Sequence, residues 1–230
     1  MSPKTLSFDD KLFRFLRQLR KNNRRDWFQD RKERYEETVK HPSLQFISDF
    51  GPRLRKISPN FVADPRPAGG SLFRIYRDVR FSKDKSPYKT SVGIQFRHKQ
   101  AKDAHCPGFY LHLEPGSCFV GLGIWHPDGP TLSQIRSVLA EDPTRWRRAT
   151  GGKAFRQEFQ LEGDSLKRPP KGYDPDHPLI EDLKRKDFIA VTQLTQSAIT
   201  APGFLDEYAR LCRAGVPFVR WLCDATGVPF

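Results

Sequence analysis

Three segments near the middle of the chain alternate strictly between apolar and more polar residues, and this period of two restricts the fold most. Their apolar positions are Val92, Ile94 and Phe96; Phe109, Leu111 and Leu113; and Cys118, Val120, Leu122 and Ile124. Such alternation predicts β-strands with one buried and one wetter face. Pro115 and Gly116 predict a hairpin turn between the second and the third of these segments. Because a parallel crossover needs about a dozen residues or more and the links are short, an antiparallel sheet is expected.

Helical periodicity precedes this β-rich region. Ser7 and Asp10 resemble a capping box at the start of a first helix. Asn23 follows a break and is placed to cap a second helix, which is expected to stop near His41 and Pro42. A third helix follows, and Pro52 inside it is expected to kink or split it.

Helical spacing returns after residue 130, with short strands expected around residues 159–161 and 188–194. We therefore predict an α+β fold, a single domain over residues 1–230 with a central, mainly antiparallel sheet on which N-terminal and C-terminal helices pack. Its parts are a helical region over 7–57, a β-rich region over 71–126 and a helical or mixed region over 131–230.

The chain is strongly basic, with a net charge of +13. A positive balance favours phosphate-bearing partners such as nucleotides, nucleic acids or anionic surfaces, although much of this charge is spread over the predicted helices. There is no apolar run long enough for a membrane span and no apolar N-terminal segment of the signal-peptide kind. We expect a soluble, cytoplasmic protein whose four widely spaced cysteines stay reduced.

The densest charge lies between residues 74 and 89. Six cations and two carboxylates fall within these sixteen residues: Arg74, Arg77, Arg80, Lys83, Lys85 and Lys89, with Asp78 and Asp84. If residues 73–78 form a strand, Arg74, Tyr76 and Asp78 share one face. Guanidinium groups fit phosphate or carboxylate in a bidentate manner, so the stretch predicts an anion pocket. The three lysines would close over it, and Tyr88 would supply a hydroxyl or a stacking ring. The alternative is a surface strand and loop with an internal Arg–Asp network.

Two other clusters are candidates to complete this pocket. A stiff loop over residues 167–178 carries Lys171, Tyr173 and His177, which would line the far side of the pocket; the alternative is a plain surface connection. Trp125 lies on the same face of a predicted strand as Gly121 and Gly123. The space above these glycines could hold a ligand, but a covering helix is the commoner way to fill it.

Several sharper patterns are absent or weak. No Walker loop or dinucleotide-binding fingerprint is present, and the histidines and cysteines match no spacing of known metal sites. We therefore expect no cofactor and no metal. Ser82 and Lys85 match a serine–lysine pattern only superficially, because they fall in a charged loop rather than on a helix.

The run from Arg74 to Lys89, RIYRDVRFSKDKSPYK, closely resembles the signature of a family of uncharacterised bacterial and fungal proteins, domain of unknown function 2461. Other landmarks of that family fit as well: Asn22-Asn23 with Trp27-Phe28, Tyr110, Gly121-x-Gly123-x-Trp125, Pro170-Lys171-Gly172-Tyr173-Asp174 and His177-Pro178. The resemblance spans nearly the whole chain. It implies one domain in which the three clusters belong together, and it implies no particular activity, cofactor or partner.

These observations predict a basic pocket for an anionic, phosphate- or carboxylate-bearing small molecule. If the protein is an enzyme, Asp78, Asp84 or His177 is the expected proton carrier. One alternative is a non-catalytic nucleic-acid-binding module in which Tyr88 or Trp125 stacks on bases. Another is a scaffold held by an internal Arg–Asp network. The oligomeric state stays open.

Overall fold

A computed structural model describes residues 7–100 and 106–230 of the chain. Its centre is a five-stranded sheet in the order β1-β2-β3-β5-β4, with every pair of neighbours antiparallel. The strands are β1 (Val92–Arg97), β2 (Gly108–Leu113), β3 (Cys118–Ile124), β4 (Gln160–Glu162) and β5 (Phe188–Leu194). The predicted antiparallel sheet and α+β class are confirmed.

Helices form the rest of the regular structure. Those before the sheet are α1 (Asp10–Lys21), α2 (Arg25–Gln29), α3 (Lys32–Tyr35), a π-helical turn η1 (Glu36–Lys40) and α4 (His41–Ile57). Those after β3 are α5 (Gly129–Glu141), α6 (Pro143–Gly151), α7 (Lys153–Glu158), α8 (Ile180–Leu183), α9 (Gln196–Thr200), α10 (Phe204–Ala214) and α11 (Val216–Ala225). Within the described ranges, no helix combines the length and apolar character needed to cross a membrane.

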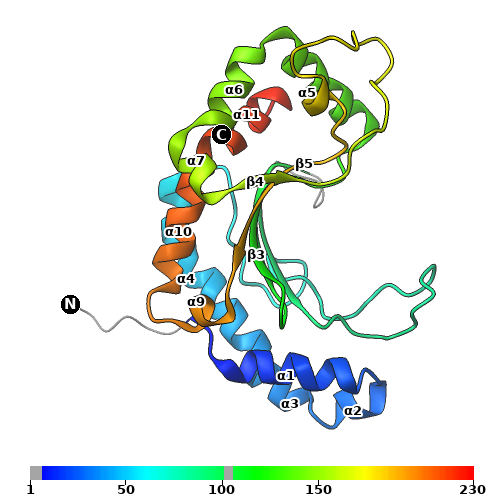
Figure 1. Cartoon of the computed structure of the whole chain (residues 1–230). Coiled ribbons are helices and arrows are strands. Elements are labelled where there is room, and N and C mark those ends of the chain that lie inside the picture. The colour runs from blue at the N-terminus through cyan, green and yellow to red at the C-terminus, as the bar shows by residue number, and fades with distance from the viewer. Residues whose placement is uncertain (1–6, 101–105) are drawn as a thin grey trace.

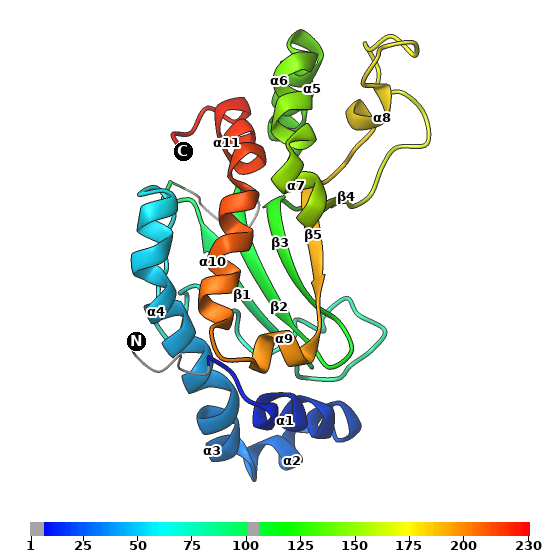
Figure 2. The ribbon, with the colours of Figure 1, turned by 60° about the vertical axis from the view of Figure 1, so that its left-hand side comes forward.

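In the parts of the chain that the structure describes, the helices cover one face of the sheet and leave the other open. Figure 2 shows α10 crossing in front of the strands, between α4 and α11. The side chains that point toward this layer, such as Ile94, Phe96 and Leu111, are fully buried and form the core. On the other face, Figure 1 shows the strands open toward two projecting segments, residues 73–90 below and 163–187 above. The alternation of the strands therefore places their wetter side chains on this open face.

Three details of the N-terminal helices differ from the sequence-based expectation. Asp9 caps α1 by accepting the backbone N–H of Lys11 at 2.7 Å, so the capping box of Ser7 and Asp10 is wrong. The helical segment does not stop at His41, because η1 leads directly into α4. Pro42 lies in the first turn of α4, where its missing N–H costs little. Helix α4 also runs unbroken through Pro52, which lies on its exposed side, so the expected split is wrong.

Candidate functional site

Residues 71–91 form an arm that leaves the edge of the sheet beside β1. Its base pairs with β1, where the N–H of Phe73 donates to Gly93 O at 2.9 Å. Farther out, its two legs pair with each other rather than with β1, through an isolated bridge between Tyr76 and Tyr88. Residues 73–78 thus do not form a strand of the sheet, and the predicted strand is wrong. Charged side chains beyond Tyr76 offer no apolar face to bury, so the legs project into solvent (Figure 1).

The faces of the arm nevertheless follow the predicted alternation. Ile75 is buried, whereas Arg74, Tyr76 and Asp78 are exposed. Tyr88 is buried too, and its ring stacks on Phe28 at 4.1 Å between centroids. One apolar side therefore holds the arm to the N-terminal helices, and the charged side faces outward.

Asn23 fastens the arm, a role that sequence reasoning missed. Its amide donates to Tyr88 O at 2.9 Å and accepts the N–H of Tyr88 at 3.1 Å, as a neighbouring strand would. The helix α2 that follows has no side-chain cap, so the expected capping by Asn23 is wrong. The sequence did offer one indication of this role, because an asparagine side chain carries both a donor and an acceptor in the geometry of a peptide group.

The carboxylates of the arm are engaged in ion pairs. Asp78 pairs with Arg80 at 2.7 Å, and Asp84 pairs with Arg77. Hydrogen bonding to the Arg80 guanidinium lowers the pKa of Asp78 to about 2. Hydrogen bonds from the Ser86 hydroxyl and then from Arg77 hold the pKa of Asp84 well below its usual range. These neighbours favour the ionised form of both carboxylates.

A pocket of about 460 Å³ lies at the base of the arm. This arm-base pocket is lined by Arg20, Asn23, Arg77, Asp84, Ser86, Tyr88, Lys89, Thr90 and Ser91. Arg20 is paired with Glu114 at 2.7 Å, and Arg77 with Asp84. Lys89 has no carboxylate partner among the described residues. Its Nζ lies 5.4 Å from the centre of the Phe73 ring. Partial burial, and then the positive charge of Arg74, lower the pKa of the Lys89 ammonium.

A larger cavity of about 690 Å³ extends along the open face of the sheet. This sheet groove is lined mostly by apolar, aromatic and glycine positions, with a few polar groups: Phe73, Gln95, Gly108, Tyr110, His112, Ser117, Phe119, Gly121, Leu122, Gly123, Trp125, Glu162, Ile189, Val191 and Gln193. Apolar walls with a few polar groups are typical of small-molecule sites. The described elements place no helix over Gly121 and Trp125, so the covering helix expected there is wrong.

The two cavities share a wall. Phe73 lines the sheet groove, and Lys89, whose ammonium lies over that ring, lines the arm-base pocket. Gly93 belongs to the same place, because a Cβ there would lie only 2.7 Å from Tyr110 Oη and 2.9 Å from Phe73 Cδ2. The glycine thus leaves room for the two rings at the junction.

A chain of polar contacts also joins the two cavities. Arg20 in the arm-base pocket donates to Glu114 at 2.7 Å. The other carboxylate oxygen of Glu114 is 3.3 Å from His112 Nε2, and His112 Nδ1 is 3.0 Å from the Tyr110 hydroxyl in the sheet groove. Burial, and then the charge of Glu114, raise the pKa of Tyr110 to about 12. The Tyr110 hydroxyl therefore stays protonated at neutral pH.

The far end of the sheet groove holds a histidine beside a buried aspartate. Trp125 is 55% exposed and stacks on His126 with 4.1 Å between ring centroids. Asp187, 1% exposed, accepts the backbone N–H of His126 at 2.8 Å and contacts its Nδ1 at 2.9 Å. Sequence reasoning missed Asp187. The pairing of Ile124 with Phe188 places it there, and that register was not predicted.

Other predicted site residues lie outside both cavities. Arg80, Lys83 and Lys85 belong to the outer part of the arm and line neither cavity. Arg74 is exposed near Lys89, whose pKa it helps to lower.

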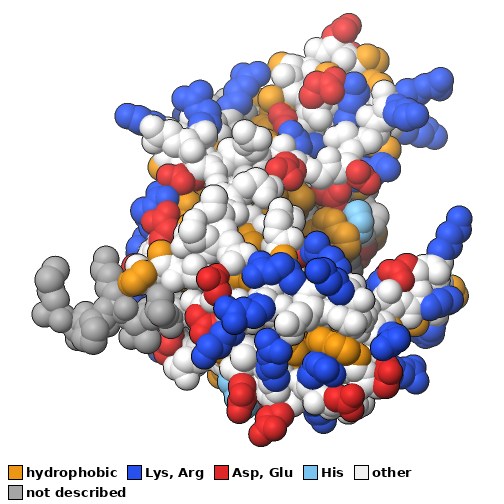
Figure 3. Space-filling view, turned by 60° about the horizontal axis from the view of Figure 1, so that its bottom comes forward, with side chains coloured by type: hydrophobic (Ala, Val, Ile, Leu, Met, Phe, Trp, Pro, Cys, Tyr) orange, Lys and Arg blue, Asp and Glu red, His pale blue; other side chains and the backbone are white. Residues whose placement is uncertain are grey.

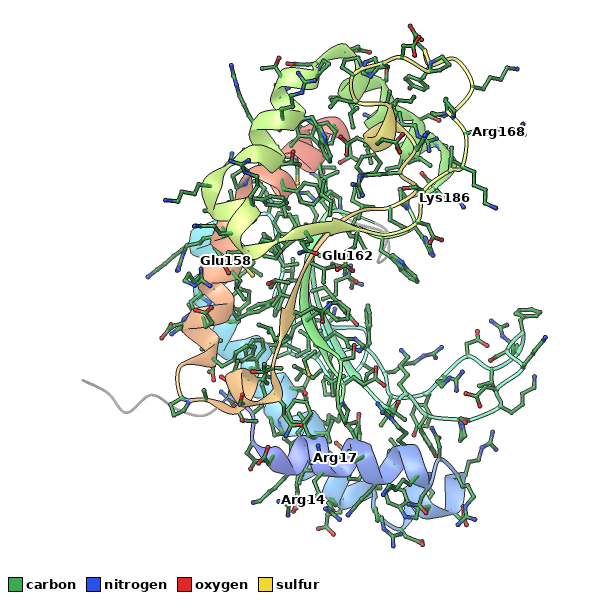
Figure 4. The ribbon with its side chains drawn as sticks, viewed as in Figure 1. Arg14, Arg17, Glu158, Glu162, Arg168 and Lys186 are labelled. Carbon is green, nitrogen blue, oxygen red and sulfur yellow. The ribbon has the colours of Figure 1, made fainter. Side chains whose placement is uncertain are left out.

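The 163–187 segment does not reach the arm-base pocket. Tyr173 packs against the core, and His177 Nδ1 accepts the N–H of Leu179 at 3.1 Å. Neither they nor Lys171 line the arm-base pocket or the sheet groove, and their part in a ligand site stays a prediction. Figure 4 shows Arg168 and Lys186 on this segment, across the open face from the arm.

The profile of a family of conserved hypothetical proteins, DUF2461, matches residues 11–221. The chain belongs to this family. The match includes the arm, the sheet and the 163–187 segment, so both cavities are made by the family's own region. Among curated proteins, no sequence matches the chain.

Proposed function

We propose that the protein binds a small ligand that carries a phosphate or carboxylate group on a flat or apolar body. The anionic group would lie in the arm-base pocket and the body in the sheet groove. One observation carries this proposal: Lys89, a cation with no carboxylate partner among the described residues, stands on the wall between a polar pocket and an aromatic groove.

The chemistry around Lys89 suits an oxyanion. Arg20 and Arg77 lie in the same pocket and could each turn a guanidinium N–H toward a bound oxygen while keeping its carboxylate partner. The hydroxyls of Ser86, Thr90 and Ser91 add short neutral donors. Beyond the shared wall, Phe73 and Tyr110 offer ring surfaces 6.0 Å apart for the body of the ligand.

The distribution of charge favours a small ligand over a nucleic-acid strand. In Figure 3, Lys and Arg side chains on the face that includes the N-terminal helices are interspersed with Asp and Glu. A backbone track for nucleic acid needs a stripe of one sign. Glu162 also lines the sheet groove, where a polyanion would meet its carboxylate.

Replacing Lys89 should weaken binding of phenyl phosphate, a probe with one phosphate and one aromatic ring. Because a hydrogen bond to a charged group is worth about 1.5–3 kcal/mol, Lys89→Met should raise the Kd at least about tenfold in isothermal titration calorimetry. Lys83→Met is the matched control, because it removes the same charge from the exposed outer arm. Equal losses in the two variants, or none in Lys89→Met, would contradict the assignment.

Binding should also depend on pH through Lys89. Its pKa is lowered in the free protein, and a bound anion favours the protonated form. Affinity is therefore fully present below the lowered pKa and falls as pH rises through it, beginning at a lower pH than for an ordinary lysine. Lys89→Arg should bind the probe with little loss at alkaline pH, because the guanidinium stays charged. A wild-type affinity that stays constant up to the ordinary lysine range would rule out this role.

A further inference from the structure

We propose that His126 and Asp187 form a proton-transfer pair at the Trp125 end of the sheet groove, and that this pair promotes hydrolysis of an ester whose apolar part lies in the groove. The proposal goes beyond anion binding and does not depend on the arm-base pocket. Phe119, which stacks on His112, is six residue steps from Trp125 along β3 and its extension, or about 20 Å at roughly 3.3 Å per residue.

The fold brings the two residues together from separate strands. Ile124 is the last residue of β3 and pairs with Phe188, the first residue of β5. Asp187 therefore lies beside the chain that leaves β3. Its second carboxylate oxygen accepts the N–H of Asp164 at 2.9 Å, from the chain that leaves β4. The carboxylate is thus held from three sides and has little freedom to turn.

The imidazole is held in one orientation. Because Asp187 only accepts when ionised, the neutral ring of His126 carries its proton on Nδ1 and presents the Nε2 lone pair outward. Stacking on Trp125 fixes the ring plane. Trp125 lines the sheet groove, and the His126 side chain is 49% exposed. His126 itself is not part of the groove lining, so its outward nitrogen would act on water or on a ligand end that extends past Trp125.

The backbone at His126 argues against a purely structural role. Its φ is +48°, in the left-handed region that few residues other than glycine adopt, histidine being one of the more frequent among them. Asp187 holds this turn both through the backbone N–H of His126 and through the Nδ1 contact. Residues other than glycine that are held in this region are found more often at functional sites.

The proposed step is general-base hydrolysis. Nε2 of His126 takes a proton from water as the water oxygen bonds to the ester carbonyl carbon. The carbon–oxygen bond to the leaving alcohol then breaks, and the proton on Nε2 passes to that oxygen. Ester and water thus yield acid and alcohol, with the imidazole returned to its starting form. Glu162 in the groove disfavours a second anion nearby, so the reacting end of the substrate is uncharged.

Hydrolysis of 4-nitrophenyl acetate and 4-nitrophenyl butyrate by the full chain tests this. His126→Asn keeps a residue that tolerates the left-handed backbone and removes the base. General-base catalysis usually contributes about a hundredfold or more to the rate. Loss of the base in this variant should therefore lower kcat/KM at least about tenfold. His41→Gln, which removes an exposed histidine on α4, should leave the rate unchanged. Equal rates for His126→Asn and the wild type, or no wild-type hydrolysis of either ester above buffer, would overturn the proposal.

Asp187 acts through His126 and is a positioning residue, so its test needs a different readout. Asp187→Asn should lower kcat with KM unchanged. Nitrogen-15 NMR of the wild type at alkaline pH should also find the His126 proton on Nδ1. A proton on Nε2 would overturn the proposal even if Asp187→Asn failed to fold.

Discussion

Gly123→Ala should destabilise the protein by about 3 kcal/mol or more, one of the largest effects of any single methyl group in this chain. Gly123 has a φ of +110°, where an L side chain is strained. An added Cβ would overlap the carbonyl oxygen of Phe188 and lie 2.9 Å from Cε1 of Phe218. The oxygen belongs to the backbone of the paired strand β5, so it cannot move aside as a flexible side chain could.

Urea unfolding of Gly123→Ala and of Gly116→Ala separates the backbone strain at positive φ from the overlap of the added Cβ with its neighbours. Gly116 also has a positive φ, of +86°, but a Cβ there meets nothing within 4 Å. Gly116→Ala should therefore lose only the conformational term, about 1–2 kcal/mol. If both variants lost the same free energy, the close approach of β3 and β5 at Gly123 would be wrong.

Asp187→Ala should cost about 3–4 kcal/mol of unfolding free energy. It removes a carboxylate that accepts the backbone N–H of His126, the N–H of Asp164 and the Nδ1 proton of His126. Hydrogen bonds to charged groups are each worth about 1.5–3 kcal/mol, and donors left without an acceptor add a further penalty. The loss is less than the sum of these terms because the exposed ring of His126 can bind water instead.

Asp9→Ala is the control for this loss. Asp9 accepts one backbone N–H, at the exposed start of α1, and its removal should cost about 1 kcal/mol. Denaturant titration of the two variants should thus differ by roughly 2 kcal/mol or more. A similar small loss in both would mean that Asp187 does not fasten the ends of β3 and β4.

The sheet was predictable because alternation reports burial directly. Ile94, Leu111 and Val120, which the pattern marked as apolar positions, are all buried on the face that the helices cover. The same pattern could not say whether the other face was covered. That depended on where the helices pack, which is a long-range outcome, and so the sheet groove at Gly121 and Trp125 was expected to be filled by a helix.

The arm was recognised as a charged site, but its structure was not. The alternation that begins at Phe73 and Ile75 makes residues 73–78 look like a strand locally. The chain leaves the sheet because Arg77 and its charged neighbours gain more from water and from pairs such as Arg77–Asp84 than from a ladder. Asn23 and Asp187 were missed for one reason: each acts on a partner more than sixty residues away, at Tyr88 and His126 respectively.

A crystal structure of the protein with phenyl phosphate bound tests the central claim most directly. We expect the phosphate within hydrogen-bond distance of Lys89 Nζ in the arm-base pocket, with the ring in the sheet groove beside Phe73 and Tyr110. A phosphate held instead by Arg80 and Lys85 on the outer arm, with the sheet groove empty of the ring, would contradict it.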